Sequence, residues 1–167
     1  MSLSSLVMEI LIEPATFPRD ENAIQSLFSR YAASLSIDLK FQKFQKELDS
    51  LPGKYAEPQG GVLLLARPIG DRSLTALGCV ALRRDLDGWC EMKRLYVAEE
   101  ARGTKLGSRL VEAIMSKAKE LGYRGIRLDS LPEMRAAQNL YRKYGFTEIP
   151  PYYNTPIVGT VFMGREL

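Results

Sequence analysis

The stretch Glu91–Gly107, EMKRLYVAEEARGTKLG, decides the fold, because it passes from a strand through a basic turn into a helix. Four of its early residues are apolar or β-favouring and predict a strand over 89–97: Met92, Leu95, Tyr96 and Val97. The first N–H groups of the helix that follows have no partner within it and carry partial positive charge. The stretch therefore predicts a site for an anionic group such as a phosphate.

Two motifs in this half of the chain resemble those of the GNAT acetyltransferase superfamily. Val97–Gly107 reads V-x-x-E-x-R-G-x-x-L-G and is similar to the family's [QR]-x-x-G-x-[GA] motif, with Lys105 in place of the usual first glycine. Ala137–Phe146 reads AQNLYRKYGF and is similar to the family's A-x-x-L-Y-x-K-x-G-F. The resemblance runs from about Leu77 to the C-terminus, whereas over 1–68 only the order of elements matches.

The periodicity of apolar residues predicts an alternation of strands and helices around one sheet, an α/β (α+β) sandwich. Strands are expected at 7–13, 61–66, 74–83, 89–97, 125–129, 146–149 and 158–166, and helices at 21–35, 39–51, 106–121 and 133–144. The resemblance implies a GNAT-like mixed, mostly antiparallel central sheet of about seven strands flanked by about four helices. It also implies that strands are splayed at the cofactor site.

Several local features are predicted within these elements. Asp20 is expected to cap the first helix, and Ser130–Glu133 has the form of a capping box for the last one. Adjacent Lys93 and Arg94 would point to opposite faces of a regular strand, which indicates a β-bulge. The inner stripe of the helix after Lys105 is predicted to consist of Leu106, Leu110, Ile114, Ala118 and Leu121.

Length and composition are those of an ordinary globular protein, with 46% hydrophobic and 26% charged residues in 167. We expect a single acetyltransferase domain over 1–167, with acceptor-side helices at about 20–52 and an acetyl-CoA-binding core at about 74–146. No long apolar run or basic leader is present, which favours a cytoplasmic protein without a membrane partner. Cys79 and Cys90 are expected to be small buried hydrophobes rather than a disulfide.

The absence of histidine removes Ser-His and Cys-His nucleophile pairs and most zinc sites, so no metal is expected. The net charge of +3 is uneven: Glu91–Gly145 holds 12 Lys/Arg and 7 Asp/Glu, which leaves −2 for the remainder. A local excess of +5 suits a polyanionic ligand. It is too modest, and too poor in interleaved aromatic residues, for nucleic acid.

The resemblance implies that acetyl-CoA is the co-substrate and assigns residues to it. Seven residues of the loop and helix start would bind its pyrophosphate: Arg102, Gly103, Thr104, Lys105, Leu106, Gly107 and Ser108. Helical φ at Lys105 would suit lysine, and its ammonium would add charge. The backbone of Leu95, Tyr96 and Val97 would lie against the pantetheine arm and polarise the thioester carbonyl. Arg142 would reach the adenine-side phosphates.

Two side chains are candidates for proton transfer. Glu91 matches the strand on which the family often places a general base; alternatively it is a solvated strand carboxylate paired with Lys93 or Arg94. A base is useful because neutralising a lysine-like amine at pH 7 costs about 4.6 kcal/mol, and an α-amine about 1.4 kcal/mol. Tyr141 matches the phenol that often protonates the departing thiolate, or else it only packs. Tyr144, three residues on, is expected in the core.

The acceptor side is the least determined part of the sequence. Family topology favours Gln42, Tyr152 and Asn154 as polar groups lining an acceptor pocket. The predicted function is an acetyl-CoA-dependent N-acetyltransferase that acts on a small or amino-acid-like primary amine by direct attack in a ternary complex. Protein or peptide amines as acceptors, and a non-catalytic acyl-CoA sensor, stay open as alternatives. A monomer or homodimer is expected.

Overall fold

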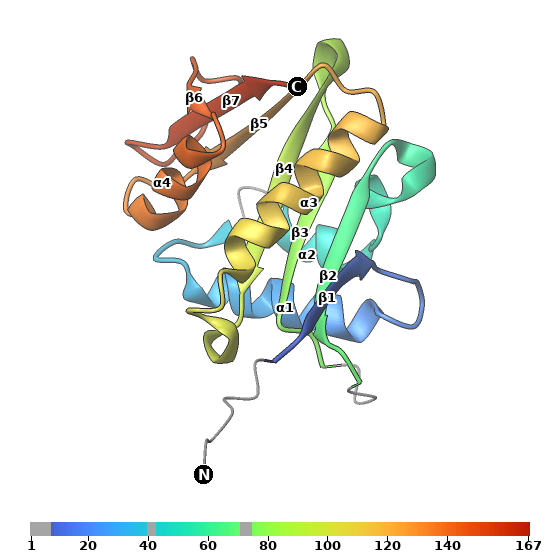
Figure 1. Cartoon of the computed structure of the whole chain (residues 1–167). Helices are drawn as coiled ribbons and strands as arrows, with labels where there is room; N and C mark the ends of the chain where they lie inside the picture. The colour runs from blue at the N-terminus through green and yellow to red at the C-terminus, as the bar shows by residue number, and fades with distance from the viewer. Residues whose placement is uncertain (1–7, 40–42, 71–74) are drawn as a thin grey trace.

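The computed structural model describes residues 8–39, 43–70 and 75–167. Within them, seven strands form one sheet in the order β1-β2-β3-β4-β5-β7-β6 (Figure 1). The strands are β1 (Ile10–Pro14), β2 (Val62–Pro68), β3 (Gly78–Arg84), β4 (Trp89–Val97), β5 (Gly125–Ser130), β6 (Thr147–Glu148) and β7 (Val161–Glu166). The α-helices of the described residues are α1 (Glu21–Ser34), α2 (Phe44–Asp49), α3 (Leu106–Glu120) and α4 (Arg135–Lys143). The predicted seven-stranded, four-helix GNAT-like architecture is confirmed.

Two apolar layers hold the helices on the sheet, and the side chains of β2 and β3 alternate between them. On the α1 side, the strands contribute Leu63, Leu65, Cys79 and Ala81, which pack with Ile24, Leu27 and Phe28. On the α3 side, they contribute Leu64, Ala66, Val80 and Leu82, which pack with Leu106, Leu110 and Ile114. Because both faces are covered (Figure 1), β2 and β3 read as continuous apolar runs rather than as alternating ones.

The sheet is antiparallel except where β5 lies beside β4. Helix α3 connects these two parallel strands, as a crossover requires. Cys79 and Cys90 are buried free thiols, as expected. No helix among the described residues is both long and apolar enough to cross a bilayer.

Several predicted elements differ in extent, among them the strand expected at 158–166, which corresponds to β7 and begins only at Val161. The expected strand 7–13 begins outside the described residues, and β1 extends one residue further, to Pro14. The expected helix 39–51 contains the shorter α2, while 40–42 lie outside the described part of the chain. The expected strand 74–83 corresponds to β3, which begins at Gly78; position 74 is also outside the description.

Both predicted side-chain caps are wrong. Asp20 stands at the N-cap of α1, but its carboxylate accepts a hydrogen bond from the Thr16 N–H and pairs with Arg67. The Ser130 hydroxyl donates to the Leu131 carbonyl, and α4 begins only at Arg135, without a side-chain cap from the described residues. Leu121 is also misassigned to the inner stripe: it follows the end of α3 and is 41% exposed.

Candidate functional site

A β-bulge interrupts β4 at Arg94, which has a φ of 60°. The pairing with β3 shifts by one residue between the Cys79–Tyr96 and Ala81–Lys93 pairs. As a result Lys93 and Arg94 are both buried, at 8% and 4% exposure, instead of one of them facing solvent. The bulge predicted from these two adjacent cations is therefore confirmed.

Strands β4 and β5 separate just before the bulge. Their parallel pairing joins only Trp89, Cys90 and Glu91 to Gly125–Arg127. Beyond Glu91 a narrow cleft with a cavity of about 40 Å³ lies between the strands and reaches α4. Its lining includes Met92, Lys93, Leu95, Leu128, Asp129, Ser130 and Tyr141.

The start of α3 has the form of an anion site. The first N–H to bond within the helix is that of Arg109, to the Lys105 carbonyl, and no described side chain caps the turn before it. Gly103 has a φ of 84°, and a Cβ there would meet nothing within 4 Å, so the loop borders open space. Lys105 has a φ of 61°. The expected helical φ at Lys105 is therefore wrong, and this lysine adopts the left-handed conformation that favours glycine.

A charged cavity of about 370 Å³ opens beside the cleft. Every residue of its lining is polar: Glu47, Lys54, Arg83, Arg84, Asp85, Glu91, Lys93, Arg94, Tyr152, Tyr153 and Asn154. Cavity and cleft share Lys93, Arg94 and Tyr153. A polar molecule in the cavity would therefore be next to whatever occupies the cleft.

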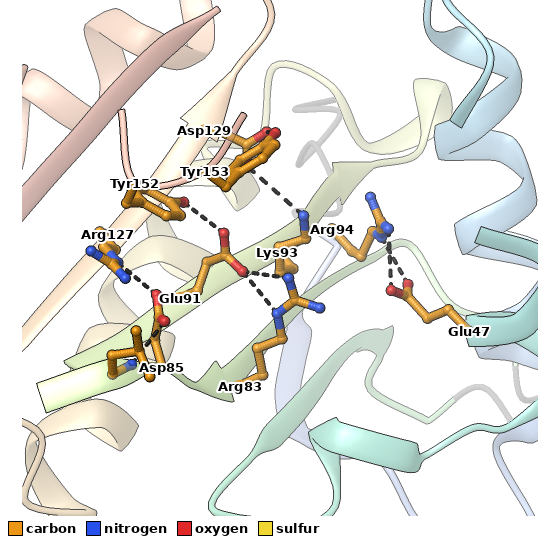
Figure 2. A network of polar contacts seen from close by, with 11 residues as sticks. Glu47, Arg83, Asp85, Glu91, Lys93, Arg94, Arg127, Asp129, Tyr152 and Tyr153 are labelled. Atoms are coloured by element: carbon orange, nitrogen blue, oxygen red, sulfur yellow. Dashed lines mark hydrogen bonds and ion pairs between the residues drawn. The ribbon is translucent and has the colours of Figure 1, made fainter. Parts of the chain in front are cut away.

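Glu91 projects into this cavity with both carboxylate oxygens engaged (Figure 2). Arg83, directly opposite on β3, approaches Oε1 at 2.7 Å, and the Tyr152 hydroxyl donates to Oε2 at 2.6 Å. The alternative pairing with Lys93 or Arg94 is wrong, because the partner comes from the neighbouring strand. Burial, reinforced by the Glu91 charge, raises the pKa of Tyr152, so the phenol is the proton donor of this pair.

A second acidic group at the junction of cleft and cavity escaped the sequence analysis. Asp129, at the carboxyl end of β5, accepts a hydrogen bond from the Tyr153 hydroxyl at 2.8 Å and lies 3.7 Å from the Lys93 ammonium. Burial lowers the pKa of Lys93, against the attraction of Asp129 and Glu91. The sequence feature that could have indicated it is an acidic residue near the carboxyl end of β5, the strand that lies parallel to β4.

Arg94 extends toward α2 and anchors it. Its guanidinium binds the Glu47 carboxylate at 2.8 and 3.2 Å and lies over the rings of Tyr31 and Phe44. Burial would raise the pKa of Glu47, but the hydrogen bond and charge of Arg94 outweigh it and lower the pKa. This buried pair fixes the wall between α2 and the bulge.

Tyr141 lines the cleft from α4 and is 8% exposed. Burial raises its pKa, so the phenol is protonated at neutral pH, as a proton donor must be. Tyr144 is only partly in the core as expected: it is half-buried and packs against the α3-side core, and its hydroxyl donates to Glu112 on α3 at 2.6 Å.

The remaining predicted residues are dispersed. Tyr152 and Asn154 line the charged cavity, whereas Gln42 lies outside the described residues. Arg142 is on the outside of α4, where it donates to Asn139 and approaches Glu148 at 3.7 Å. Among the described residues, no cluster of three or more His, Cys, Asp or Glu is arranged to hold a metal ion.

Comparison with known proteins agrees with this geometry. The family model for the acetyltransferase (GNAT) domain matches residues 66–148. An uncharacterised N-acetyltransferase of Schizosaccharomyces pombe is 40% identical over 159 residues, 95% of each chain. An IAA acetyltransferase of Azospirillum brasilense is 33% identical over 135 residues, 73% of this chain and 87% of the other. A GNAT-family acetyltransferase structure from Staphylococcus aureus Mu50 has a TM-score of 0.76 at 21% identity, covering 95% and 99% of the two chains.

The chain belongs to the GNAT superfamily and is an N-acetyltransferase. The co-substrate of this family is acetyl-CoA, and the residues present fit it. The uncapped start of α3 offers N–H donors to a phosphate beside the open loop at Gly103. The separated edges of β4 and β5 offer backbone groups to an extended arm.

Proposed function

We propose that this protein transfers the acetyl group of acetyl-CoA to the primary amine of a small molecule bound in the charged cavity. The observation that carries the proposal is the junction at Lys93, Arg94 and Tyr153, where this cavity meets the cleft between β4 and β5. An amine on one side would face a thioester on the other. Such proximity is a large part of what a direct transfer requires.

The residues proposed to hold acetyl-CoA follow the chain from strand to helix. Backbone groups of Leu95–Val97 would bind the arm, and N–H groups between Gly103 and Ser108 would bind the pyrophosphate, with charge from Arg102 and Lys105. Exposed Arg142 would bind the adenine-side phosphates. When bound, acetyl-CoA supplies a thioester whose carbonyl carbon accepts the amine.

Proton transfer is assigned to the tyrosines and Glu91. The Tyr152 hydroxyl already donates to Glu91, so it can pass that proton to the carboxylate while it takes one from the amine. The amine nitrogen forms the N–C bond, the C–S bond breaks, and Tyr141 gives its proton to the departing thiolate. No acyl-enzyme is needed, because the transfer is direct.

Calorimetric titration with acetyl-CoA, followed by a thiol-release screen over a panel of amines, tests this function. The panel includes peptides with free N-termini, and IAA, the compound in the name of the Azospirillum brasilense relative, is assayed beside it. Binding with thiol release from a small amine supports the proposal. Release from peptides alone would indicate a protein acceptor, and binding without any release would indicate an acyl-CoA sensor.

A further inference from the structure

The charges around the acceptor cavity are unbalanced. A second cavity of about 260 Å³ adjoins it and shares Glu47, Lys54 and Arg83. Together the two cavities are lined by seven cationic side chains and three anionic ones. The cations are Lys43, Lys46, Lys54, Arg83, Arg84, Lys93 and Arg94, and the anions are Glu47, Asp85 and Glu91.

Each of the three carboxylates is already neutralised by an arginine (Figure 2). Glu47 pairs with Arg94 at 2.8 Å, Asp85 with Arg127 at 2.6 Å, and Glu91 with Arg83 at 2.7 Å. A cationic acceptor would therefore find no unengaged carboxylate in this lining. It would have to compete with an arginine that is held in place by the protein.

Four cations of the cavity lining, in contrast to these carboxylates, have no ion-pair partner among the described residues. Lys43, Lys46, Lys54 and Arg84, here named the basic rim, are exposed and form no ion pair with other described residues. They gather over α2, the turn before β2 and the end of β3, far apart in the sequence. Their charge would favour a ligand that brings its own negative group.

We infer that the acceptor amine carries an anionic group, a carboxylate or a phosphate-type oxyanion, which binds at Lys54 and Arg84 of the basic rim while the amine reaches the junction with the cleft. The inference rests on the proposed function, because it names the acceptor of that same site. It also excludes polyamines, whose second ammonium would meet the rim.

The strand register sets the size of this acceptor. Lys93 pairs with Ala81 and marks the junction, whereas Arg84 of the basic rim pairs with Cys90, three residues away along β4. Three residues of antiparallel strand span about 10 Å, of which a hydrogen bond to the rim takes about 3 Å. The amine and the anionic group should therefore be separated by a short chain, such as that of glutamate or 4-aminobutyrate.

Matched acceptors test the charge requirement in a thiol-release assay with the full chain and saturating acetyl-CoA. Glutamate is compared with glutaminamide, in which both carboxylates are replaced by amides, and 4-aminobutyrate with 4-aminobutyramide, 3-aminopropylphosphonate and 1,4-diaminobutane. We expect kcat/KM to be about tenfold or more higher for each anionic acceptor than for its neutral counterpart. Glutarate, which lacks an amine, should compete with any active acceptor, and glutaramide should not. The comparison of 4-aminobutyrate with 3-aminopropylphosphonate shows whether the site prefers a carboxylate or a phosphate-type oxyanion.

Charge reversal at the rim supplies the second arm. Arg84→Glu and Lys54→Glu should each raise KM for the anionic acceptor about tenfold with kcat unchanged, because they act on binding alone. The amide acceptor should change less than about twofold, and Arg84→Lys should restore wild-type behaviour. Lys119→Glu, an exposed site on α3 across the sheet, is the matched control for net charge.

The outcomes separate this inference from the function on which it rests. Thiol release that prefers neutral or cationic amines, or equal loss for acid and amide in Arg84→Glu, would overturn the anionic acceptor and leave the acetyltransferase standing. No release from any amine would overturn the proposed function and this inference together.

Discussion

Lys105 combines a side chain suited to phosphates with a backbone conformation suited to glycine. Its φ of 61° is left-handed, which costs a non-glycine residue about 1–2 kcal/mol. A glycine at this position would relieve the strain. The greater conformational entropy of glycine in the unfolded chain would cancel part of the resulting gain in stability. The position thus separates two contributions, charge and strain, that a single substitution would confuse.

Replacing Lys105 in two ways should separate them. Lys105→Gly removes charge and strain, whereas Lys105→Ala removes only the charge. We expect Lys105→Gly to be more stable than Lys105→Ala by about 1 kcal/mol in urea denaturation. Both should bind coenzyme A more weakly than wild type and to the same extent. Unchanged affinity in both variants would show that the ammonium does not contact the phosphates.

Tyr141 and Tyr144 test the proposed proton donor as a pair. Tyr141→Phe should lower kcat about 100-fold, near the low end for a general acid, because a thiolate is already a fair leaving group. Tyr144→Phe should leave kcat unchanged, since its hydroxyl contacts Glu112 outside the cleft. The readout is kcat from pH 6 to 9, and equal rates for wild type and Tyr141→Phe would remove the acid role.

The partners of Glu91 show what a sequence can and cannot give at this scale. The position of Glu91 on the strand 89–97 could be predicted, because a strand is recognised from neighbouring residues in the sequence. Its contacts with Arg83 and Tyr152 depend on strand register and on a loop 61 residues away. The sequence suggests the nearby Lys93 and Arg94 as partners of Glu91. In the structure, however, Lys93 pairs with Asp129 and Arg94 pairs with Glu47.

Among the elements, α3 was predictable because its period is sustained over four turns, from Leu106 to Ala118. The short length of α2 and the late start of α4 could not be predicted. Six residues give too little periodicity, and Ser130 finds a nearer carbonyl than the helix it was expected to cap. The bulge could be predicted only because two cations, Lys93 and Arg94, are adjacent in the strand.

The α2–β4 contact rests on the Glu47–Arg94 pair, and Glu47→Gln should break it. Arg94 would remain buried without the carboxylate of Glu47, so we expect a loss of about 3 kcal/mol at pH 7. The lowered pKa of Glu47 means that the pair stabilises the fold above the unfolded pKa of about 4.3. That stabilisation disappears as the pH falls through the folded-state pKa.

Urea denaturation of wild type and Glu47→Gln at pH 7 and pH 3 checks both the size and the sign. The difference between the two proteins should shrink as the pH falls, because protonated Glu47 resembles glutamine. Asp49→Asn, which alters an exposed carboxylate on the same helix, should have little effect at either pH. A difference that is constant with pH would contradict the assignment of the stabilisation to this charge.

At the scale of the whole molecule, the sheet consists of two halves. β1–β4 with α1–α3 form one, β5–β7 with α4 the other, and the strands join them only through the short β4–β5 pairing. The α3-side core also bridges the halves, through Leu110, Ile126, Tyr141, Phe146 and Met163. Both cleft and charged cavity lie at this boundary. A ligand bound there would add contacts where the sheet itself supplies few.

Binding of acetyl-CoA should therefore be visible as local protection and as global stability. Hydrogen exchange should slow at Leu95–Val97 and at Gly103–Ser108, the two segments proposed to bind the arm and the pyrophosphate. Exchange in β1 should not change, because that strand lies at an edge of the sheet, with β2 and β3 between it and β4. At a concentration of 100 Kd the free energy of unfolding should rise by about 2.7 kcal/mol. Protection spread evenly over the chain, with none at Gly103–Ser108, would mean that acetyl-CoA stabilises the fold without using the loop that resembles the family motif.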